Sequence, residues 1–375
     1  MNIATPRLYI DLLQYNMING LPNTITTGGD LQETYGRIDG SSLIGMTPYN
    51  THYFIPNDSD SFINIRYAKP FNNFIDTSQG ANKLWVGLFG HNFRELDNGN
   101  SQTRFKVKMG EYSPDLTSII NCDINTANNE TTISFPQNGF SMFTINSFNG
   151  GEGKKTIKLL FDNNWDYEDT SKPAILGTIG SGIIYDFNHA PDMQLSMTRD
   201  FSGSNKVETV GGHQHVNLNW YKVADWGKTS PYELQGYNTD ILSDTDTEAD
   251  AVRQGNARTG RRIFDMRYSF LDRDKAFPRY ELQQSLDDGL NSTLYDFDDG
   301  NDVSVGIDED TDTKTLYGDV LRYTVGDACN FLFQYNKDNF KGDELAICKF
   351  NQSKFQFQQV LHNKYTVNLS MTEQI

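Results

Sequence analysis

Two histidines in the middle of the sequence are spaced so that they could share a metal ion. His213 and His215 are separated by Gln214, and side chains at positions i and i+2 of a β-strand point to the same side. Two imidazoles on one side would form half of a metal site, which ligands from elsewhere would have to complete. The alternative is a surface turn after Gly211-Gly212 that leads into the strand HVNLNWY. We favour the turn and expect no metal.

The acidic segment at residues 295–312 contains enough carboxylates to suggest calcium. An EF-hand loop needs acidic or amide ligands at positions 1, 3 and 5, glycine at position 6 and glutamate at position 12. With Asp296 at the first position, Asp298 takes the third, but Gly300 falls where the third ligand belongs, so the spacing fails. A looser calcium site stays open, although a solvated acidic loop explains the composition better.

In the stretch KLWVGLFGHNF (residues 83–93), a histidine follows directly after an apolar run. His91 could serve there as a general base. Gly90 and Asn92 on either side both tolerate positive φ, however, so Gly-His-Asn is typical of a turn that ends a strand. The nearest carboxylates, Glu95 and Asp97, fall in a polar segment, so catalysis by His91 has no local support.

Other catalytic and cofactor patterns are missing from the sequence. Sixteen of the 49 Asp and Glu residues cluster in two acidic segments, and no pair stands out on strand ends to face a cleft as glycosidase chemistry requires. The motifs GxSxG, GxxxxGK[ST] and GxGxxG do not occur. Of the three cysteines, Cys122, Cys329 and Cys348, the last two lie in apolar runs and are expected to be buried, inert thiols. We therefore expect no catalytic residue, no cofactor and no enzymatic activity.

The elements that would have to position any such residues are predicted to be β-strands. Short runs with alternating, β-branched or aromatic residues recur along the whole chain, separated by clusters of Gly, Asn, Asp, Pro and Ser. Examples are RLYIDLL (7–13), KLWVGLF (83–89), RRIFDMRYSFL (261–271), VLRYTV (320–325) and LAICKF (345–350). This pattern predicts an all-β protein built from sandwiches or barrels.

The length of 375 residues suits two domains, and a change of character marks a boundary between them. Near residues 172–182 the sequence runs SKPAILGTIGSG, with one proline and three glycines. We place the first domain at residues 1–175 and the second at residues 180–375. The second is interrupted by acidic insertions near residues 240–250 and 285–312, which we interpret as loops, because uncompensated like charges resist packing.

Charge and hydropathy exclude two classes of partner. The net charge is −17, and residues 281–313 hold eleven acidic residues without a basic one, while residues 240–250 hold five more. A nucleic-acid partner would need a basic face, so none is expected. No run of about 18 apolar residues predicts membrane insertion, and no signal peptide is visible at the start. The few unpaired cysteines fit folding in a reducing cytoplasm.

Eight segments, which together extend over nearly the whole chain, follow one another in an order that can be compared with known proteins. They are ATPRLYIDLLQYNMINGL, LWVGLFGHNF, TIKLLFD, AILGTIGSGIIYDF, NHAPDMQLSMTRDF, TVGGHQHVNLNWY, GRRIFDMRYSFLDRD and the closing residues 330–375, which contain Glu373. Together they resemble the structural tail proteins of tailed bacteriophages from aquatic sources. No single segment is specific, so the resemblance depends on their joint order. The acidic insertions are where this chain departs from that pattern.

The resemblance implies a fold and a role. In the phage proteins the segment with Gly-His-Asn lies in a galactose-binding-like (discoidin-like), jelly-roll-like β-sandwich, which here would be residues 1–175, facing outward. Residues 180–375 would form a β domain that builds a homo-oligomeric ring. The implied role is a distal-tail-like component of the tail tip or baseplate, in contact with the tail tube and other tail-tip proteins. Its implied location is the virion, after synthesis in the host cytoplasm.

Two groups of aromatic residues are candidate contact sites. Trp and Tyr concentrate in protein interfaces, and five of them fall in a Pro- and Gly-containing stretch: Trp220, Tyr221, Trp226, Tyr232 and Tyr237. They would anchor an interface or else pack a loop on their own domain. The alternative function is a carbohydrate-binding, host-recognition module of the phage tail. Its candidate glycan contacts are the loop residues Tyr49, His52, Tyr53 and Phe54, whereas Trp85 is expected in the core.

Overall fold

In a computed structural model, antiparallel β-sheets make up most of the residues whose structure is described. It describes residues 5–20, 24–28, 43–46, 52–54, 62–67, 84–91, 104–111, 119–123, 132–134, 140–145, 147–148, 154–161, 174–187, 189–192, 195–200, 204–218, 261–277, 315–337 and 345–374. Every strand pair within these residues is antiparallel, and the helices are few and short. The predicted all-β class is therefore confirmed.

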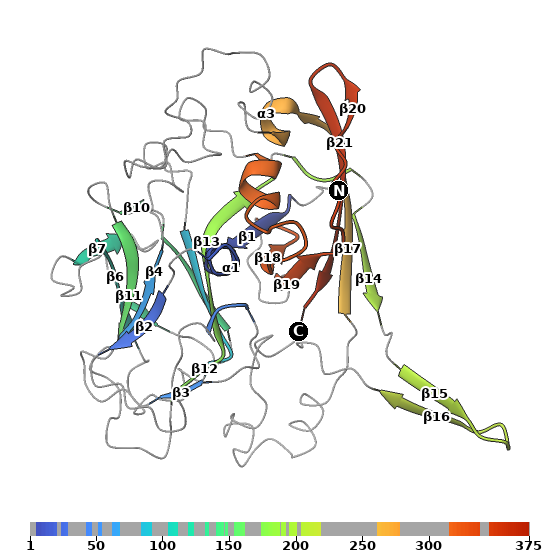
Figure 1. The fold of residues 1–375 in the computed structure, drawn as a ribbon, viewed down its shortest axis with the longest axis horizontal. Helices are drawn as coiled ribbons and strands as arrows, with labels where there is room; N and C mark the ends of the chain where they lie inside the picture. The colour runs from blue at the N-terminus through green and yellow to red at the C-terminus, as the bar shows by residue number, and fades with distance from the viewer. Residues whose placement is uncertain are drawn as a thin grey trace.

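The largest sheet has ten strands (Figure 1). Nine follow one another in the order β14-β17-β21-β19-β18-β1-β13-β5-β9, and β20 pairs with β21 beside this path. In chain order they are β1 (Arg7–Asp11), β5 (Leu84–Phe89), β9 (Phe140–Ile145), β13 (Thr178–Asp186), β14 (Ser196–Asp200), β17 (Arg261–Asp272), β18 (Phe331–Gln334), β19 (Leu345–Phe350), β20 (Gln358–Leu361) and β21 (Lys364–Glu373). Strands from both ends of the sequence thus share one sheet, in which β1 pairs with β18.

A seven-stranded sheet and two small ones complete the β-structure. The seven strands run in the order β10-β7-β6-β11-β4-β2, with β8 beside β6. They are β2 (Thr24–Gly28), β4 (Phe62–Arg66), β6 (Arg104–Glu111), β7 (Ile119–Asp123), β8 (Thr132–Ser134), β10 (Ser147–Phe148) and β11 (Lys154–Phe161). The small sheets pair β3 (His52–Phe54) with β12 (Ala174–Leu176), and β15 (Ser204–Glu208) with β16 (Gln214–Leu218).

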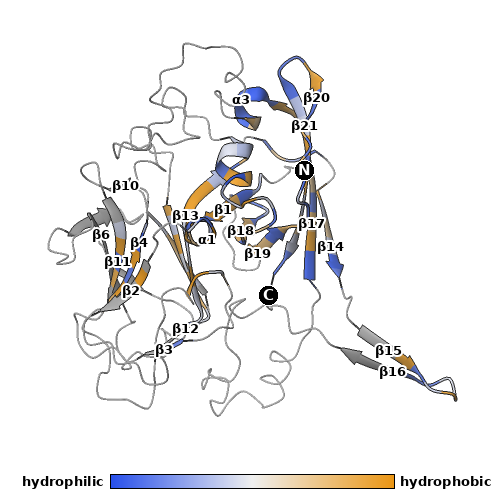
Figure 2. Cartoon of the chain, in the orientation of Figure 1, coloured by the Kyte–Doolittle hydropathy of each residue, from blue (hydrophilic) through white to orange (hydrophobic). Residues whose placement is uncertain are grey.

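The core lies where the two large sheets face each other. Buried residues of the seven-stranded sheet, such as Ile63 and Leu159, belong to the same apolar cluster as Trp85 and Ile179 of the ten-stranded sheet. Figure 2 shows hydrophobic colour along β13, β4 and β11, whereas β14 at the edge of the large sheet is mostly hydrophilic. Trp85 is fully buried, so its predicted place in the core is confirmed. A jelly-roll-like topology for residues 1–175 stays a prediction.

The glycine-rich stretch near residues 172–182, where a domain boundary is predicted, takes part in two strands. It forms β12 and β13, and β13 is buried along nearly its whole length. Its glycines serve close packing: a Cβ on Gly182 would lie 2.1 Å from the backbone oxygen of Ile10, and one on Gly180 would lie 2.6 Å from the ring of Trp85. The ten-stranded sheet runs across this position, so the predicted division into residues 1–175 and 180–375 does not separate two sheets.

Two predicted strands are partly or wholly helical. RLYIDLL ends as a strand at Asp11, because the Asp11 side chain accepts a hydrogen bond from the N–H of Leu13 and caps α1 (Leu12–Ile18). VLRYTV enters a π-helix, η6 (Leu316–Leu321), capped in the same way by Thr315. The prediction failed there because β-branched residues can also fill a buried helix, where tertiary packing overrides propensity. A four-residue helix, α3 (Arg273–Ala276), follows β17.

Candidate functional site

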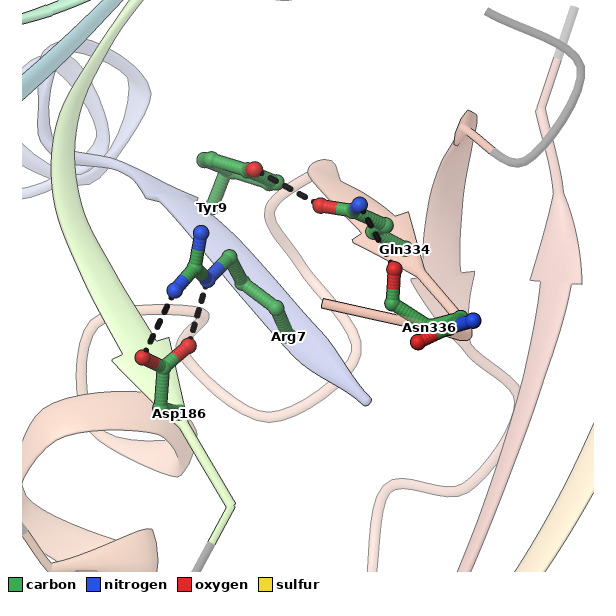
Figure 3. Close-up of polar contacts among 5 residues, drawn as sticks. All are labelled: Arg7, Tyr9, Asp186, Gln334 and Asn336. Carbon is green, nitrogen blue, oxygen red and sulfur yellow. Dashed lines mark hydrogen bonds and ion pairs between the residues drawn. The ribbon is translucent and has the colours of Figure 1, made fainter. Parts of the chain in front are cut away.

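A polar cluster joins three neighbouring strands at the start of β1 (Figure 3). The Arg7 guanidinium donates two hydrogen bonds to the Asp186 carboxylate of β13, from Nε to Oδ1 at 2.5 Å and from Nη2 to Oδ2 at 2.8 Å. The Tyr9 hydroxyl donates to Gln334 Oε1 of β18 at 2.7 Å, and Gln334 Nε2 donates to the backbone oxygen of Asn336. The hydrogen bond to Asp186 raises the pKa of Arg7 above its usual range, and burial raises the pKa of Tyr9. The cluster holds β13, β1 and β18 in register.

A second polar cluster lies buried below α1. Asp11 Oδ1 accepts from the N–H of Leu13 at 3.0 Å and from that of Ser181 at 3.3 Å. Burial raises the pKa of Asp11 to about 7. The Tyr67 hydroxyl donates to Ser181 Oγ, which donates in turn to the backbone oxygen of Trp85 at 2.9 Å. Asp11, Tyr67, Ser181 and Trp85 are all at most 1% exposed, so a substrate could not reach this serine and carboxyl group.

His91 is part of the interior rather than of an exposed turn. Gly90 has a φ of 69°, as the predicted strand-ending turn requires, but the imidazole that follows is 1% exposed. Its Nε2 lies 2.9 Å from Ser141 Oγ on β9. Burial lowers the pKa of His91 to about 3, so the ring stays neutral and holds β5 against β9.

The structure places the histidine pair in a hairpin and two of the cysteines in the interior. His213 is exposed in the turn before β16, and His215 follows in that strand. Within the described part of the chain, no group of three or more His, Cys, Asp or Glu side chains is arranged to hold a metal ion. Cys329 and Cys348 are buried free thiols, as predicted, and burial raises both pKa values, that of Cys329 to about 12. The acidic segments 240–250 and 285–312 lie outside the described residues.

Strands β15 and β16 form a hairpin whose described side chains are exposed to solvent. This hairpin extends beyond the edge of the large sheet and away from the other strands (Figure 1). Residues 207–214 are all exposed, including two valines, Val207 at 55% and Val210 at the tip. Its turn is well formed, since Gly212 with a φ of 77° donates to the backbone oxygen of Thr209, and Thr209 and His213 exchange hydrogen bonds.

Among the described strands, β14, which precedes the hairpin, comes last in the order of the ten-stranded sheet. It pairs with β17 on one side, and four of its five residues are exposed, among them Met197 at 55%. An edge strand presents unpaired backbone N–H and C=O groups to which another chain can add a strand. Strand β14 and the hairpin β15–β16 together form the candidate site among the described residues, because both expose apolar side chains.

The aromatic residues predicted as contacts are only partly placed by the structure. Trp220, Tyr221, Trp226, Tyr232 and Tyr237 lie outside the described residues, as does Tyr49. His52, Tyr53 and Phe54 were expected in a loop, but they form β3, where His52 is half-buried opposite Leu176 of β12. The loop assignment is wrong because three residues with high β-propensity found a pairing partner far along the chain.

Sequence reasoning did not single out this candidate site, because no local signal fixes the position of a strand in a sheet. MQLSMTRDF and HVNLNWY were both predicted as strands, and the glycine pair was predicted as a turn. The position of β14 in the sheet depends on its pairing with β17, whose partner residues lie 61 to 69 positions further along the chain. The only sequence signal for the site was the Gly211-Gly212 turn between two polar strands.

Comparison of the sequence with models of known protein families gives no match, and comparison with curated proteins gives none either. None of the helices in the described ranges is both long and apolar enough to cross a lipid bilayer.

Proposed function

We propose that the protein is a structural component of the virion of a tailed bacteriophage. It is a tail-tip or baseplate protein, distal-tail-like, that assembles into a homo-oligomeric ring and contacts the tail tube and other tail-tip proteins. The order of segments along the chain, which resembles tail structural proteins, motivates the class. The observation that carries the assembly role is the exposed edge of β14 beside the projecting hairpin β15–β16.

The polar contacts between strands, one partly buried and one fully buried, agree with a structural role. Arg7 with Asp186, and Asp11 with Ser181, join strands that are far apart in the sequence, and each group is held by backbone or side-chain partners. An arrangement of this kind makes a rigid body, which suits a part that transmits contacts within a large assembly. Symmetric oligomers of such bodies bury otherwise exposed edges.

The experiment is to measure the mass and shape of the purified full-length chain. We expect light scattering after size-exclusion chromatography to give a multiple of 42.6 kDa, and electron microscopy to show closed rings. A chain that stays monomeric at all concentrations and forms no ring would overturn the proposal. The carbohydrate-binding alternative stays a prediction, and a glycan array probed with the full-length chain tests it in parallel.

A further inference from the structure

We propose that strand β20 (Gln358–Leu361) pairs with β20 of a second copy of this chain, antiparallel and about a two-fold axis. Among the described strands, β20 pairs with β21 alone, beside the main path of the ten-stranded sheet. The contact goes beyond the proposed ring and does not depend on it, because a two-fold contact joins two copies and then closes. It would join the large sheets of the two copies edge to edge.

The exposure of β20 makes it accessible to another chain. All four of its residues are exposed, with Val360 at 40% and Leu361 at 59%. The chain on both sides of it, residues 345–374, is described throughout, and the hairpin β20–β21 lies at the upper edge of the described structure in Figure 1. A strand at an exposed edge offers backbone N–H and C=O groups to which a further strand can be added.

The sequence around β20 lacks the residues that normally prevent pairing between edges. Proteins protect exposed edge strands with charged residues or with proline. The seven residues 355–361, FQFQQVL, contain neither, although the chain has a net charge of −17. Uncharged segments of this length with high β-propensity pair readily with identical copies. The register shift between Gln359 and Leu361 limits the length of regular strand, so we expect a short pairing rather than an open-ended fibre.

The glutamines make this segment complementary to itself. A carboxamide both donates and accepts hydrogen bonds, so two glutamines can face each other, whereas two like charges repel. The uncharged segment overlaps its copy over the greatest length when the axis passes through its central residue, Gln358. Gln358 then faces its own copy, and Phe357 stands opposite Gln359. A second copy therefore fits this strand with no charged residue opposite another along residues 355–361.

The aromatic residues of the segment hold its backbone in place before a partner arrives. The ring of Phe355 contacts that of Phe350, with ring centroids 5.2 Å apart, and the ring of Phe357 contacts that of Phe277, with centroids 4.6 Å apart. Both contacts anchor the chain that leads into β20. Because this backbone is already ordered, pairing costs less conformational entropy than pairing with an unordered segment would.

Disulfide trapping with a single variant tests the position of the axis. In Gln358→Cys the two copies of one residue would face each other, and directly opposite residues of antiparallel strands have Cα atoms about 4.5–5.5 Å apart, which a disulfide can span. We expect mild oxidation of the full-length variant to give a covalent dimer as the main product. Cys329 and Cys348 are buried and should not compete, and Cys122→Ser in all samples removes the third thiol.

The matched control moves the cysteine by one residue within the same exposed strand. In Gln359→Cys each thiol would face Phe357 of the second copy, and the two thiols would lie on a diagonal about 7–8 Å apart, beyond the usual reach of a disulfide. The yield of dimer should therefore be several-fold lower than with Gln358→Cys. Equal yields from the two variants, or no dimer from Gln358→Cys, would overturn the proposed pairing.

Charged variants at the same residue test the contact without a covalent link. Gln358→Glu and Gln358→Lys each place two like charges opposite each other, so each alone should weaken self-association, measured by light scattering, about threefold to tenfold. An equal mixture brings glutamate opposite lysine and should restore association. Weakening without recovery in the mixture would show that Gln358 does not face its own copy.

Electron microscopy of the same samples separates this contact from the proposed ring. Rings that persist while no link forms through Gln358 would overturn the β20 contact and leave the ring standing. A link through Gln358 in a chain that forms no ring would support the contact and overturn the ring. A chain that stays monomeric at all concentrations would overturn both.

Discussion

Two buried side chains with opposite pKa shifts should give this protein a characteristic dependence of stability on pH. Asp11 and His91 are each 1% exposed. Burial raises the pKa of Asp11 from 3.8 to about 7 and lowers that of His91 from 6.5 to about 3. Each shift means that the folded and unfolded chains bind a different number of protons over part of the pH range, so stability must change with pH there.

The two groups act in opposite directions. Between about pH 4 and 7 the folded chain keeps the Asp11 proton that the unfolded chain has lost, so stability falls as pH rises, by about 1.4 kcal/mol per pH unit. Between about pH 3 and 6.5 the unfolded chain protonates histidine while the folded chain does not, so His91 makes stability rise with pH at the same rate. From about pH 4 to 6.5 the contributions of Asp11 and His91 therefore cancel.

Asp11→Asn removes the contribution of Asp11 to the pH dependence of stability, and the asparagine can still cap helix α1. The amide oxygen can still accept from the N–H groups of Leu13 and Ser181, and Asp11 Oδ2, which the amide nitrogen replaces, has no hydrogen-bond partner among the described residues. Relative to the unchanged chain, the variant should gain about 1.4 kcal/mol per pH unit from pH 4 to 7, on the order of 4 kcal/mol in total. Any constant cost of burying the amide shifts the whole difference without changing its slope.

Urea unfolding at half-unit steps from pH 4 to 8 measures this difference, because subtracting the two curves removes the contribution of all other carboxylates. His91→Gln is the matched variant: it should lose stability relative to the unchanged chain as pH rises from about 4 to 6.5, for the reason given above. The double variant should follow the unchanged chain in slope. A constant difference between Asp11→Asn and the unchanged chain over pH 4–7 would refute the reasoning, since it would mean that Asp11 is ionised in the folded state.

Three further changes test the packing. Arg262 and Glu373 form a buried ion pair, with Nη2 and Oε1 2.7 Å apart. Arg262→Met should therefore lower the free energy of unfolding, measured with a chemical denaturant, by about 3–5 kcal/mol. Lys364→Met, which breaks the exposed pair with Asp272, should lower it by at most about 1 kcal/mol. Gly182→Ala forces a Cβ against the backbone of β1 and should prevent folding or cost more than about 3 kcal/mol, whereas Gly211→Ala, with nothing near its Cβ, should be nearly neutral by circular dichroism melting. Phe270 is exposed with a φ of 61°, so Phe270→Gly should raise the unfolding free energy by about 1 kcal/mol relative to Phe270→Ala; an equal stability of these two variants would contradict the strain.

Strands were predictable where a run of residues carries its own β signal. LAICKF became β19 with the predicted bounds, and RRIFDMRYSFL became most of β17. Helix α1 was missed although Asp11 before LLQYNMI is a recognisable N-cap. The role of the glycines in β13 could not be predicted, because their reason is the ring of Trp85 and the backbone of Ile10, which reach them only through tertiary pairing. The position of β14 in the sheet could not be predicted for the same reason, because it depends on pairing with the distant strand β17.

Strand β1 pairs with strands that are distant in the sequence, so a fragment of the chain that contains β1 loses its neighbours. It lies between β13 and β18, and its polar contacts span the sequence: Arg7 to Asp186 over 179 residues and Tyr9 to Gln334 over 325. A fragment of residues 1–175 would keep β1 but lose both neighbours, leaving Leu8, Tyr9 and Ile10, which are at most 1% exposed in the full chain, without cover. Failure of such a fragment to bind glycans would therefore report on its folding. Binding and assembly have to be measured on the full-length chain, where the body that presents β14 and the hairpin is complete.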